Sequence, residues 1–422
     1  MHTTFIQAFI FNFSAAFIYK IALLLHQIFL YSAISHHLYG QQSSLFAALY
    51  LLIALTNFGF DETLLPFFSI YSQSKRQCKQ LLLHLYAHIT ITAIIAMICY
   101  ATIAYGPGAL LHNLQTYCNK NLIFLLTILF FFESVKKSII AMMQLAFLSK
   151  QIAYAQVSML LAYIVCVWSL FYWNGQLTLE DIFGVLLITS MVELGYLSYN
   201  FTQFYQRLSQ ETDAPDIPFK VFFKQRIFNY INQITKVVYS PNSMTLYFAY
   251  ALGFAQAATI KFFTNIITLS YTCIAKSFGV TSGALFSSSN QTDIAKFFKD
   301  ITYRYFQFLS ILSCVMLSIV SYAYYTYMIT QVMAWQILLF FSISFLEHVA
   351  ITYEQLLMSQ NKTLILACMN ASSLTLLLIC GYGYSNSLVR WPIILCMFII
   401  IKIISLWAVR LVTRKHFEQN IQ

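Results

Sequence analysis

Polar and charged side chains recur inside apolar stretches of this sequence, at spacings that place them on one face of a helix. Asn229, Gln233 and Lys236 stand four and three residues apart within the segment FNYINQITKVVYS. In a helix this spacing puts all three on one stripe. A charge at the centre of a bilayer costs about 2.5–3.5 kcal/mol, so the stripe is expected to face water or polar groups of another helix.

Seven lysines lie inside apolar stretches, namely Lys20, Lys136, Lys137, Lys236, Lys261, Lys276 and Lys402. We interpret Lys20, Lys236 and Lys261 as cations that line a cavity and bind an anionic substrate, with Asn229, Gln233 and Asn265 as their polar neighbours. A lysine suits this task because its hydrated ammonium group can follow mobile phosphate oxygens. The alternative is structural pairing with buried carboxylates, and for Lys402 it is snorkelling toward the membrane surface.

Carboxylates in or near the same stretches could couple transport to a proton gradient, because a buried carboxylate takes up a proton readily. Asp61, Glu62 and Glu133 are the candidates for this role. Lys136 and Lys137 follow Glu133 by three and four residues, so pairs within one helix are the alternative interpretation.

The sequence offers little for catalysis or metal binding. His84 and His88 share a helix face at a spacing of four, but neither an H-E-x-x-H motif nor a third ligand accompanies them, which favours packing. The nine cysteines are dispersed without a C-x-x-C pair, and neither a P-loop nor a G-x-S-x-G motif is present. We therefore expect no enzyme activity, no cofactor and no metal site.

The composition indicates a protein with many membrane-spanning helices. Hydrophobic residues make up 59% of the 422, charged residues 9%, and the mean hydropathy is +0.70. A bilayer core about 30 Å thick needs about 20 apolar residues per helix. Stretches of about that length or longer predict twelve spans: 5–32, 43–68, 80–104, 120–147, 151–173, 182–206, 223–240, 245–287, 300–330, 334–358, 363–384 and 389–412.

The basic residues predict the orientation of these spans and argue against a nucleic-acid partner. The net charge is +10, but the lysines and arginines are dispersed over short connectors rather than gathered in one domain. Placing both termini in the cytoplasm puts fifteen basic residues on the cytoplasmic side and two, Lys120 and Arg390, on the other. This bias follows the positive-inside rule. The first span has no cleavage signal and is expected to remain.

A polar linker, SQETDAPDIP, divides six predicted spans from six. We therefore predict an N-terminal lobe at 1–208, a cytoplasmic linker at 209–220, and a C-terminal lobe with a short tail at 221–422. A faint repeat accompanies the division, since FNFSAAFIYK (11–20) opens the first half and FNYINQITK (228–236) opens the second. Two halves of equal topology would be related by a pseudo-twofold axis along the membrane normal.

The segment HHLYGQQSSLFAALYLLIALTNFGFDETLLPFFS, from His36 to Ser69, resembles the opening of polysaccharide transporters in the multidrug/oligosaccharidyl-lipid/polysaccharide exporter superfamily. The resemblance implies a V-shaped central cavity and a monomeric flippase that moves a lipid-linked, polyprenyl-diphosphate oligosaccharide across a bacterial inner membrane by alternating access. Polysaccharide-assembly enzymes would be its partners. The chain departs from the family pattern at Asp61 and Glu62, and at Ala257, Ala258 and Lys261.

Three other interpretations stay open. A multidrug-extrusion-like or other small-solute transporter would carry a soluble substrate. A membrane glycosyltransferase or polymerase would need a long outer loop with catalytic residues, whereas the connector at 105–119 is short. A scaffold without transport activity would pair its lysines internally.

Overall fold

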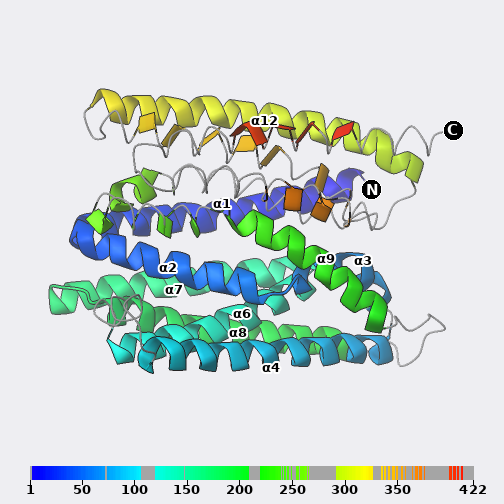
Figure 1. Ribbon diagram of the computed structural model, residues 1–422, viewed down its shortest axis with the longest axis horizontal. Helices are drawn as coiled ribbons and strands as arrows, with labels where there is room; N and C mark the ends of the chain where they lie inside the picture. Colours follow the sequence, from blue (N-terminus) through cyan, green and yellow to red (C-terminus); the bar gives the residue numbers. More distant parts are fainter. Residues whose placement is uncertain are drawn as a thin grey trace.

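The computed structural model describes residues 2–71, 74–105, 119–146, 148–208, 219–238 and 291–326, with short pieces between 240 and 265 and between 334 and 411. These residues are almost entirely helical, and the long helices run side by side along the longest axis of the molecule (Figure 1). The expected all-helical class is confirmed. The predicted count of twelve spans falls partly outside the described residues.

The first half of the chain forms a helical bundle. Its helices are α1 (His2–Ala33), α2 (His36–Thr56), α3 (Phe60–Tyr71), α4 (Lys75–Tyr105), α6 (Lys120–Leu145), α7 (Ser149–Asn174) and α8 (Leu179–Gln206). Beyond it lie α9 (Phe219–Val238) and α12 (Gln291–Tyr325). Residues 209–218 of the predicted linker lie outside the described residues, and its last two residues, Phe219 and Lys220, belong to α9.

Several helix ends are fixed by side chains that complete the backbone hydrogen bonding. The hydroxyl of Ser35 accepts from the N–H of Leu38 at the start of α2, and the Asn119 side chain accepts from Leu122 at the start of α6. Thr178 and Asp181 form a reciprocal capping box at the start of α8. These caps leave few unsatisfied groups where the connectors are short.

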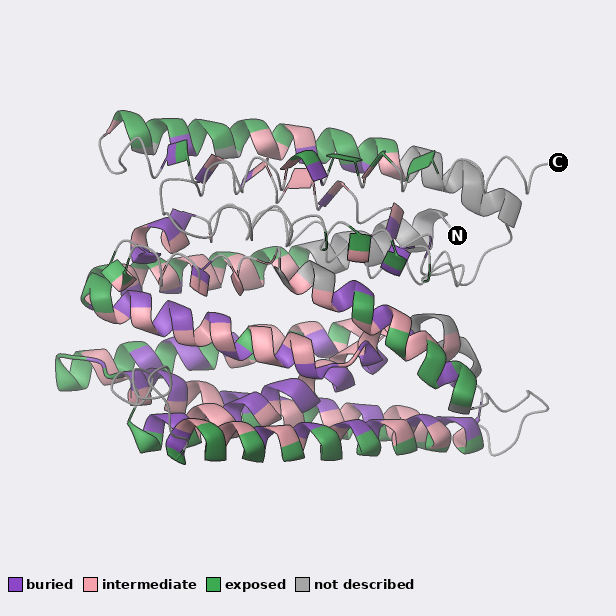
Figure 2. Cartoon of the chain, in the orientation of Figure 1, coloured by how far each residue is buried: buried purple, intermediate pink, exposed green. Residues whose placement is uncertain are grey.

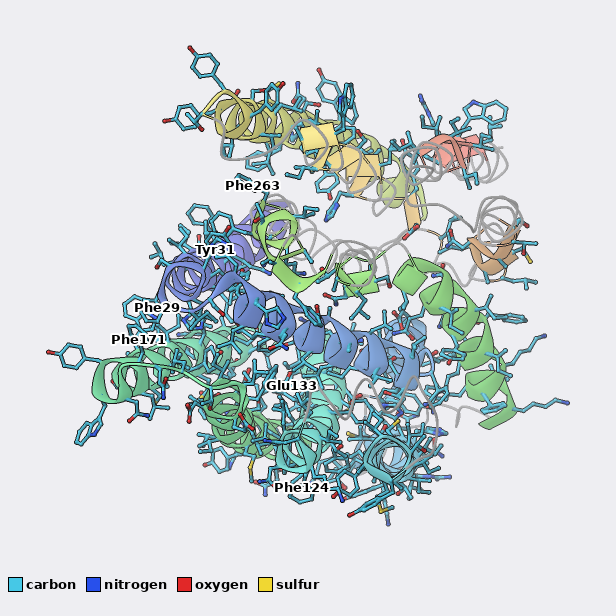
Figure 3. The ribbon with its side chains drawn as sticks, turned by 60° about the vertical axis from the view of Figure 1, so that its left-hand side comes forward. Phe29, Tyr31, Phe124, Glu133, Phe171 and Phe263 are labelled. Atoms are coloured by element: carbon cyan, nitrogen blue, oxygen red, sulfur yellow. The ribbon has the colours of Figure 1, made fainter. Side chains whose placement is uncertain are left out.

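Helix α6 occupies the centre of the bundle and packs against α2, α3, α4 and α8. Its side chains reflect this position, since Leu129 and Met142 are fully buried whereas Phe124 lies at the surface (Figure 3). Helix α4 exposes one face along its length (Figure 2), and that face carries apolar residues such as Leu83 and Met97. An apolar exposed face on a long helix is what contact with lipid tails requires.

Six helices or helix segments of the described part are long and apolar enough to cross a membrane: Ala16–Ala33, His36–Thr56, Lys75–Tyr105, Ser149–Asn174, Leu179–Gln206 and Thr302–Tyr322. The chain is therefore a multi-pass membrane protein. Helix α6 has the length of a span, but Lys120, Glu133, Lys136 and Lys137 lower its hydropathy.

Several predicted spans differ from the structure in their boundaries, and residues with positive φ account for two of the differences. The span expected at 43–68 starts at His36 and is broken at Phe58 and Gly59, which adopt φ of 49° and 68°. The connector expected after Ser240 contains helical residues, and the chain turns instead at Gly253, with φ of 81°. A left-handed residue ends a helix, and glycine tolerates this conformation because it lacks a Cβ.

Candidate functional site

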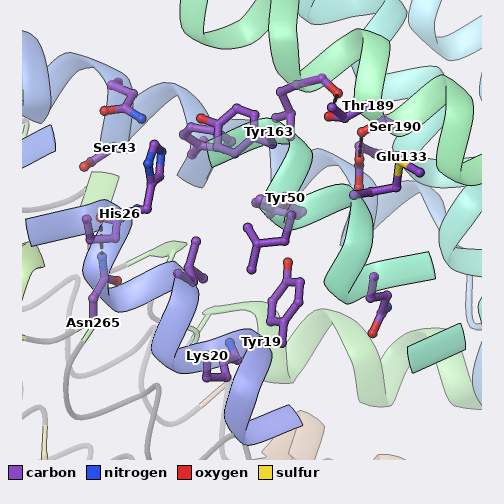
Figure 4. A pocket seen from close by; sticks show the side chains of 18 of the residues that line it. Tyr19, Lys20, His26, Ser43, Tyr50, Glu133, Tyr163, Thr189, Ser190 and Asn265 are labelled. Atoms are coloured by element: carbon purple, nitrogen blue, oxygen red, sulfur yellow. Dashed lines mark hydrogen bonds between the residues drawn. The ribbon is translucent and has the colours of Figure 1, made fainter. Parts of the chain in front are cut away.

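A cavity of about 240 Å³ lies between α1, α2, α6, α7 and α8. Residues from the second half of the chain complete its wall. In Figure 4, Ser43, His26 and Asn265 stand at one side and Glu133, Ser190 and Thr189 at the other. The lining residues that carry ionisable, amide or aromatic groups are Tyr19, Lys20, His26, Gln27, Gln42, Phe46, Tyr50, Glu133, Lys136, Gln156, Tyr163, Glu193, Asn242, Lys261 and Asn265.

A buried acid–base cluster forms one wall of this cavity. The Lys136 ammonium lies 2.5 Å from an oxygen of Glu133 on its own helix and 2.9 Å from an oxygen of Glu193 on α8. The Ser190 hydroxyl donates to Glu133, and both carboxylates are buried. Glu133 and Lys136 stand one turn apart on α6, as do Ser190 and Glu193 on α8, so each helix presents two polar groups to the other. Lys136 thus forms the pair with Glu133 that was the alternative interpretation, and it also lines the cavity.

The structure brings Lys20, Lys261, Asn265 and Glu133 to the same cavity. Lys20 comes from the middle of α1, and Lys261 and Asn265 come from the segment after Gly253. With Lys136, the described part of the cavity wall holds three lysines and two glutamates, a formal charge of +1 for these residues.

Asn265 also ties the two halves of the chain together. Its amide donates to Gln27 Oε1 of α1 at 3.2 Å, and the Tyr39 hydroxyl of α2 donates to the same oxygen. One α1 side chain therefore joins α2 to the second half beside the cavity. Three of the seven lysines cannot be placed, because the side chain of Lys236 and the whole of Lys276 and Lys402 lie outside the described residues.

Asn229 and Gln233, expected in the cavity, lie elsewhere, and this is a correction. The Asn229 amide donates to the Thr63 hydroxyl at 2.9 Å, and Gln233 Oε1 accepts from the backbone N–H of Gly59 at 3.1 Å. Both are buried. Asn229 and Gln233 of α9 thus bind polar groups at the break between α2 and α3, because the broken helix leaves backbone groups that need partners.

We call this junction the Gly59 contact, formed by residues 58–63 of the α2–α3 corner and residues 226–233 of α9. A Cβ placed on Gly59 would lie 2.6 Å from the carbonyl oxygen of Arg226 and from the backbone nitrogen of Tyr230. Arg226 donates to the Phe58 carbonyl at 3.0 Å. Here α3 and α9 approach backbone to backbone, so the contact depends on a residue without a side chain.

A second close approach, the Gly40 contact, joins the start of α2 to the backbone of Phe254. A Cβ on Gly40 would lie 2.1 Å from the Phe254 carbonyl oxygen. Beside it, the hydroxyls of Tyr31 and Thr259 lie 3.2 Å apart, and the Tyr31 ring stacks on Phe262 with centroids 4.8 Å apart. The two halves therefore meet near both ends of α2, with the cavity between the contacts.

Asp61 and Glu62, the other candidate coupling carboxylates, do not line the cavity. They occupy the first turn of α3, where acidic residues favour the helix dipole. A carboxylate oxygen of Asp61 lies 3.6 Å from the ammonium group of Lys137. Lys137 therefore pairs across helices rather than with Glu133, because one residue of offset from Lys136 turns it toward α3.

His84 and His88 pack as the sequence favoured. The His84 ring stacks on Phe222 of α9, and the His88 ring stacks on Phe60 while its Nδ1 lies 3.0 Å from an Arg226 nitrogen. Among the residues that the structure describes, no group of three or more potential ligands could hold a metal ion.

His26 and Gln42 are cavity residues that the sequence analysis missed. His26 lies within the predicted span 5–32, and Gln42 directly precedes the predicted span 43–68. Both are polar residues in or beside an apolar stretch, which is the signal that singled out the lysines. Neither carries a fixed charge, so neither stood out by its insertion cost.

Comparison with known proteins gives a clear answer for the fold. A mutant form of the Vibrio cholerae MATE transporter VcmN matches with a TM-score of 0.61 and 11% identity over 99% of this chain and 98% of its own. The eukaryotic MATE transporter AtDTX14 matches with a TM-score of 0.65 and 13% identity over 99% of both chains. The chain has the MATE fold.

A third MATE transporter, of the MOP superfamily and in an outward-facing conformation, matches with a TM-score of 0.67 and 10% identity over 98% of this chain and 95% of its own. These neighbours are transporters rather than enzymes. No protein-family model matches the sequence, and no curated protein matches it. The MATE fold thus extends over nearly the whole chain at very low sequence identity.

Proposed function

We propose that this protein is an alternating-access secondary transporter of small organic solutes, of the multidrug-extrusion kind, with the Glu133–Lys136–Glu193 cluster as its site of proton exchange. The observation that carries the proposal is this cluster in the wall of a cavity within a MATE fold. Two carboxylates share one ammonium group, so one of them can accept a proton without leaving the lysine unpaired.

The geometry supports coupling between proton and substrate. A solute in the cavity would lie against the same wall as the cluster, so the charge of the cluster would change the affinity for the solute, and the reverse. The two halves of the chain meet near both ends of α2, and exchange between an inward-facing and an outward-facing state requires one contact to open at a time.

The proton-exchange role predicts a specific loss in purified protein reconstituted into liposomes. With an imposed pH gradient, the protein should accumulate at least one of two fluorescent probes, cationic ethidium or anionic fluorescein. Glu193→Gln should reduce gradient-driven accumulation by about tenfold or more, because removing an ionisable coupling group abolishes its proton exchange. Exchange of the probe without a gradient should remain.

Glu180→Gln is the matched control, since Glu180 lies on the same helix and bonds to Asn119 away from the cavity. It should behave as the unaltered protein does. Equal gradient dependence in Glu193→Gln and the unaltered protein would reject proton exchange at the cluster, and a failure of both probes to accumulate would reject small-solute transport of this kind.

A second candidate, flipping of a lipid-linked oligosaccharide, is favoured by Lys20 and Lys261 in one cavity. Two cations that line one cavity would suit the diphosphate of such a lipid. A flippase needs its anion to arrive on a lipid, whereas a small-solute carrier takes it from water. Movement of a prenyl-diphosphate sugar together with exclusion of soluble probes would favour the flippase.

We further propose a bacterial inner membrane with both termini in the cytoplasm, on the basis of the fifteen-to-two bias of basic residues. Reporter domains fused after Lys79 and Lys299 should then be cytoplasmic, and reporters fused near Gly40 and Gly175 should lie outside. Paired phosphatase and fluorescent-protein fusions measure this directly. Consistent inversion of all four reports would overturn the orientation.

A further inference from the structure

Two polar atoms of residues that line the cavity are buried without a hydrogen-bond partner among the described residues: Nε2 of His26 and Oε1 of Gln42. The two residues are 1% and 2% exposed, respectively. A buried polar atom left unpaired is unfavourable, and native proteins rarely retain one without a reason. Both atoms belong to residues that line the same cavity.

The hydrogen bond at Nδ1, the other ring nitrogen of His26, determines whether Nε2 carries a proton. The indole Nε1–H of Trp168 lies 3.2 Å from His26 Nδ1, and an indole nitrogen can only donate. His26 Nδ1 therefore accepts, which places the single proton of the neutral imidazole on Nε2. Tyr163 holds the ring edge-on, with centroids 5.0 Å apart. Nε2–H is thus a fixed donor.

Gln42 Oε1 is an acceptor at a similar depth in the bundle. Helices α1 and α2 are joined only through Ile34 and Ser35, and His26 precedes this connection by about as many residues as Gln42 follows it. At about 1.5 Å of rise per residue, both side chains lie roughly 10–13 Å from the turn. A donor on α1 and an acceptor on α2 therefore lie at about the same distance from the turn, in residues that line the cavity.

We propose that His26 and Gln42 bind a hydroxyl group of an organic anion, accepting from it at Gln42 and donating to it at His26. A hydroxyl is the smallest group that both accepts and donates. An anion is proposed because the described lining residues carry a formal charge of +1, with Lys20 and Lys261 among them. Tyr19, Tyr50 and Tyr163 offer faces for an apolar or aromatic body. This inference rests on the proposed transport function and names its substrate class.

Equilibrium binding to the full-length protein in nanodiscs tests the inference without a gradient. The soluble probes are 3-phenyllactate and 3-phenylpropionate, which differ by one hydroxyl. The lipid-borne probes are 2-hydroxymyristate and myristate, which differ in the same way. The protein should prefer the hydroxylated member of one pair by about tenfold, the combined effect of two neutral hydrogen bonds. The pair that shows the preference identifies a solute from water or from the bilayer.

Gln42→Leu and His26→Phe should each abolish most of this preference, which is the ratio of the affinities for the two members of a pair. Thr189→Val is the control, because the Thr189 hydroxyl lines the same cavity but donates within its own helix. It should retain the preference. His26→Phe should also shift the emission of Trp168, which loses its acceptor, and this confirms that the altered ring was in place.

Three results would overturn the inference: no hydroxyl preference in either pair, a preference that survives both substitutions, or no binding of any probe. The first two would mean that the atoms bind ordered water only. Failure here is distinct from failure of the transport proposal. Gradient-driven transport without hydroxyl preference removes the subsite alone, whereas hydroxyl-selective binding without gradient dependence removes the coupling alone.

Discussion

Replacing Lys136 by glutamine should lower the free energy of unfolding by about 3–5 kcal/mol, because it leaves Glu133 and Glu193 buried side by side without their shared cation. Abundance in the membrane should fall with it. Lowering the pH should restore part of the lost stability in this variant, since protonation removes the uncompensated charges. Denaturant unfolding in mixed micelles at two pH values measures both effects.

The neighbouring Lys137→Gln is the matched control. Its ammonium group lies 3.6 Å from Asp61 and its side chain is 41% exposed, against 12% for Lys136. A half-exposed pair contributes about 1 kcal/mol or less, so this variant should stay close to the unaltered protein. Adding Glu133→Gln and Glu193→Gln to Lys136→Gln should recover most of the stability. Equal losses in the two single lysine variants would contradict the buried-cluster account.

Gly59→Ala should be the second most damaging substitution. The added Cβ would meet the backbone of α9 at 2.6 Å on two atoms, and backbone cannot rotate away as a side chain can. The residue also sits at φ of 68°, which an alanine adopts at a cost of about 1 kcal/mol. With overpacking of about 1–3 kcal/mol, the total loss should reach about 2–4 kcal/mol. Thermal unfolding of the solubilised protein measures it.

Gly175→Ala separates the cost of the left-handed backbone from the cost of overpacking. Gly175 ends α7 with φ of 70°, but a Cβ there would meet nothing within 4 Å. Only the backbone cost of about 1 kcal/mol should appear. Asparagine tolerates the left-handed region, so Gly175→Asn should be milder still, whereas Gly59→Asn should be as harmful as alanine. If Gly59→Ala and Gly175→Ala were equally mild, the close approach of α3 and α9 would not exist.

The sequence predicted the fold well where long apolar runs are bounded by charged or capping residues. The predicted spans at 120–147 and 151–173 agree with α6 and α7 to within about two residues, because span length is set by the membrane rather than by neighbours. Insertion cost singled out Lys20, Lys261 and Glu133, and these three residues line one cavity.

The sequence could not predict which polar stripe faces the cavity and which faces another helix. Asn229 and Gln233 satisfy backbone and hydroxyl groups at the Gly59 contact, and that need arises only because α2 breaks at Phe58. A local pattern reports that a stripe is polar, but its partner comes from packing between distant segments. The same limit hid Gln42, because what singles it out is that its Oε1 has no hydrogen-bond partner among the described residues.

The acid–base cluster would also make the proposed transport cycle sensitive to voltage. With both carboxylates ionised, Glu133, Lys136 and Glu193 together carry one negative charge, and with one proton bound they carry none. A potential of 100 mV contributes about 2.3 kcal/mol per charge moved across the whole field, scaled by the fraction crossed. An interior-negative potential would thus favour the outward-facing state of the ionised cluster and leave the return of the protonated cluster unaffected. The electrical and chemical parts of the proton gradient would then act on opposite halves of the cycle.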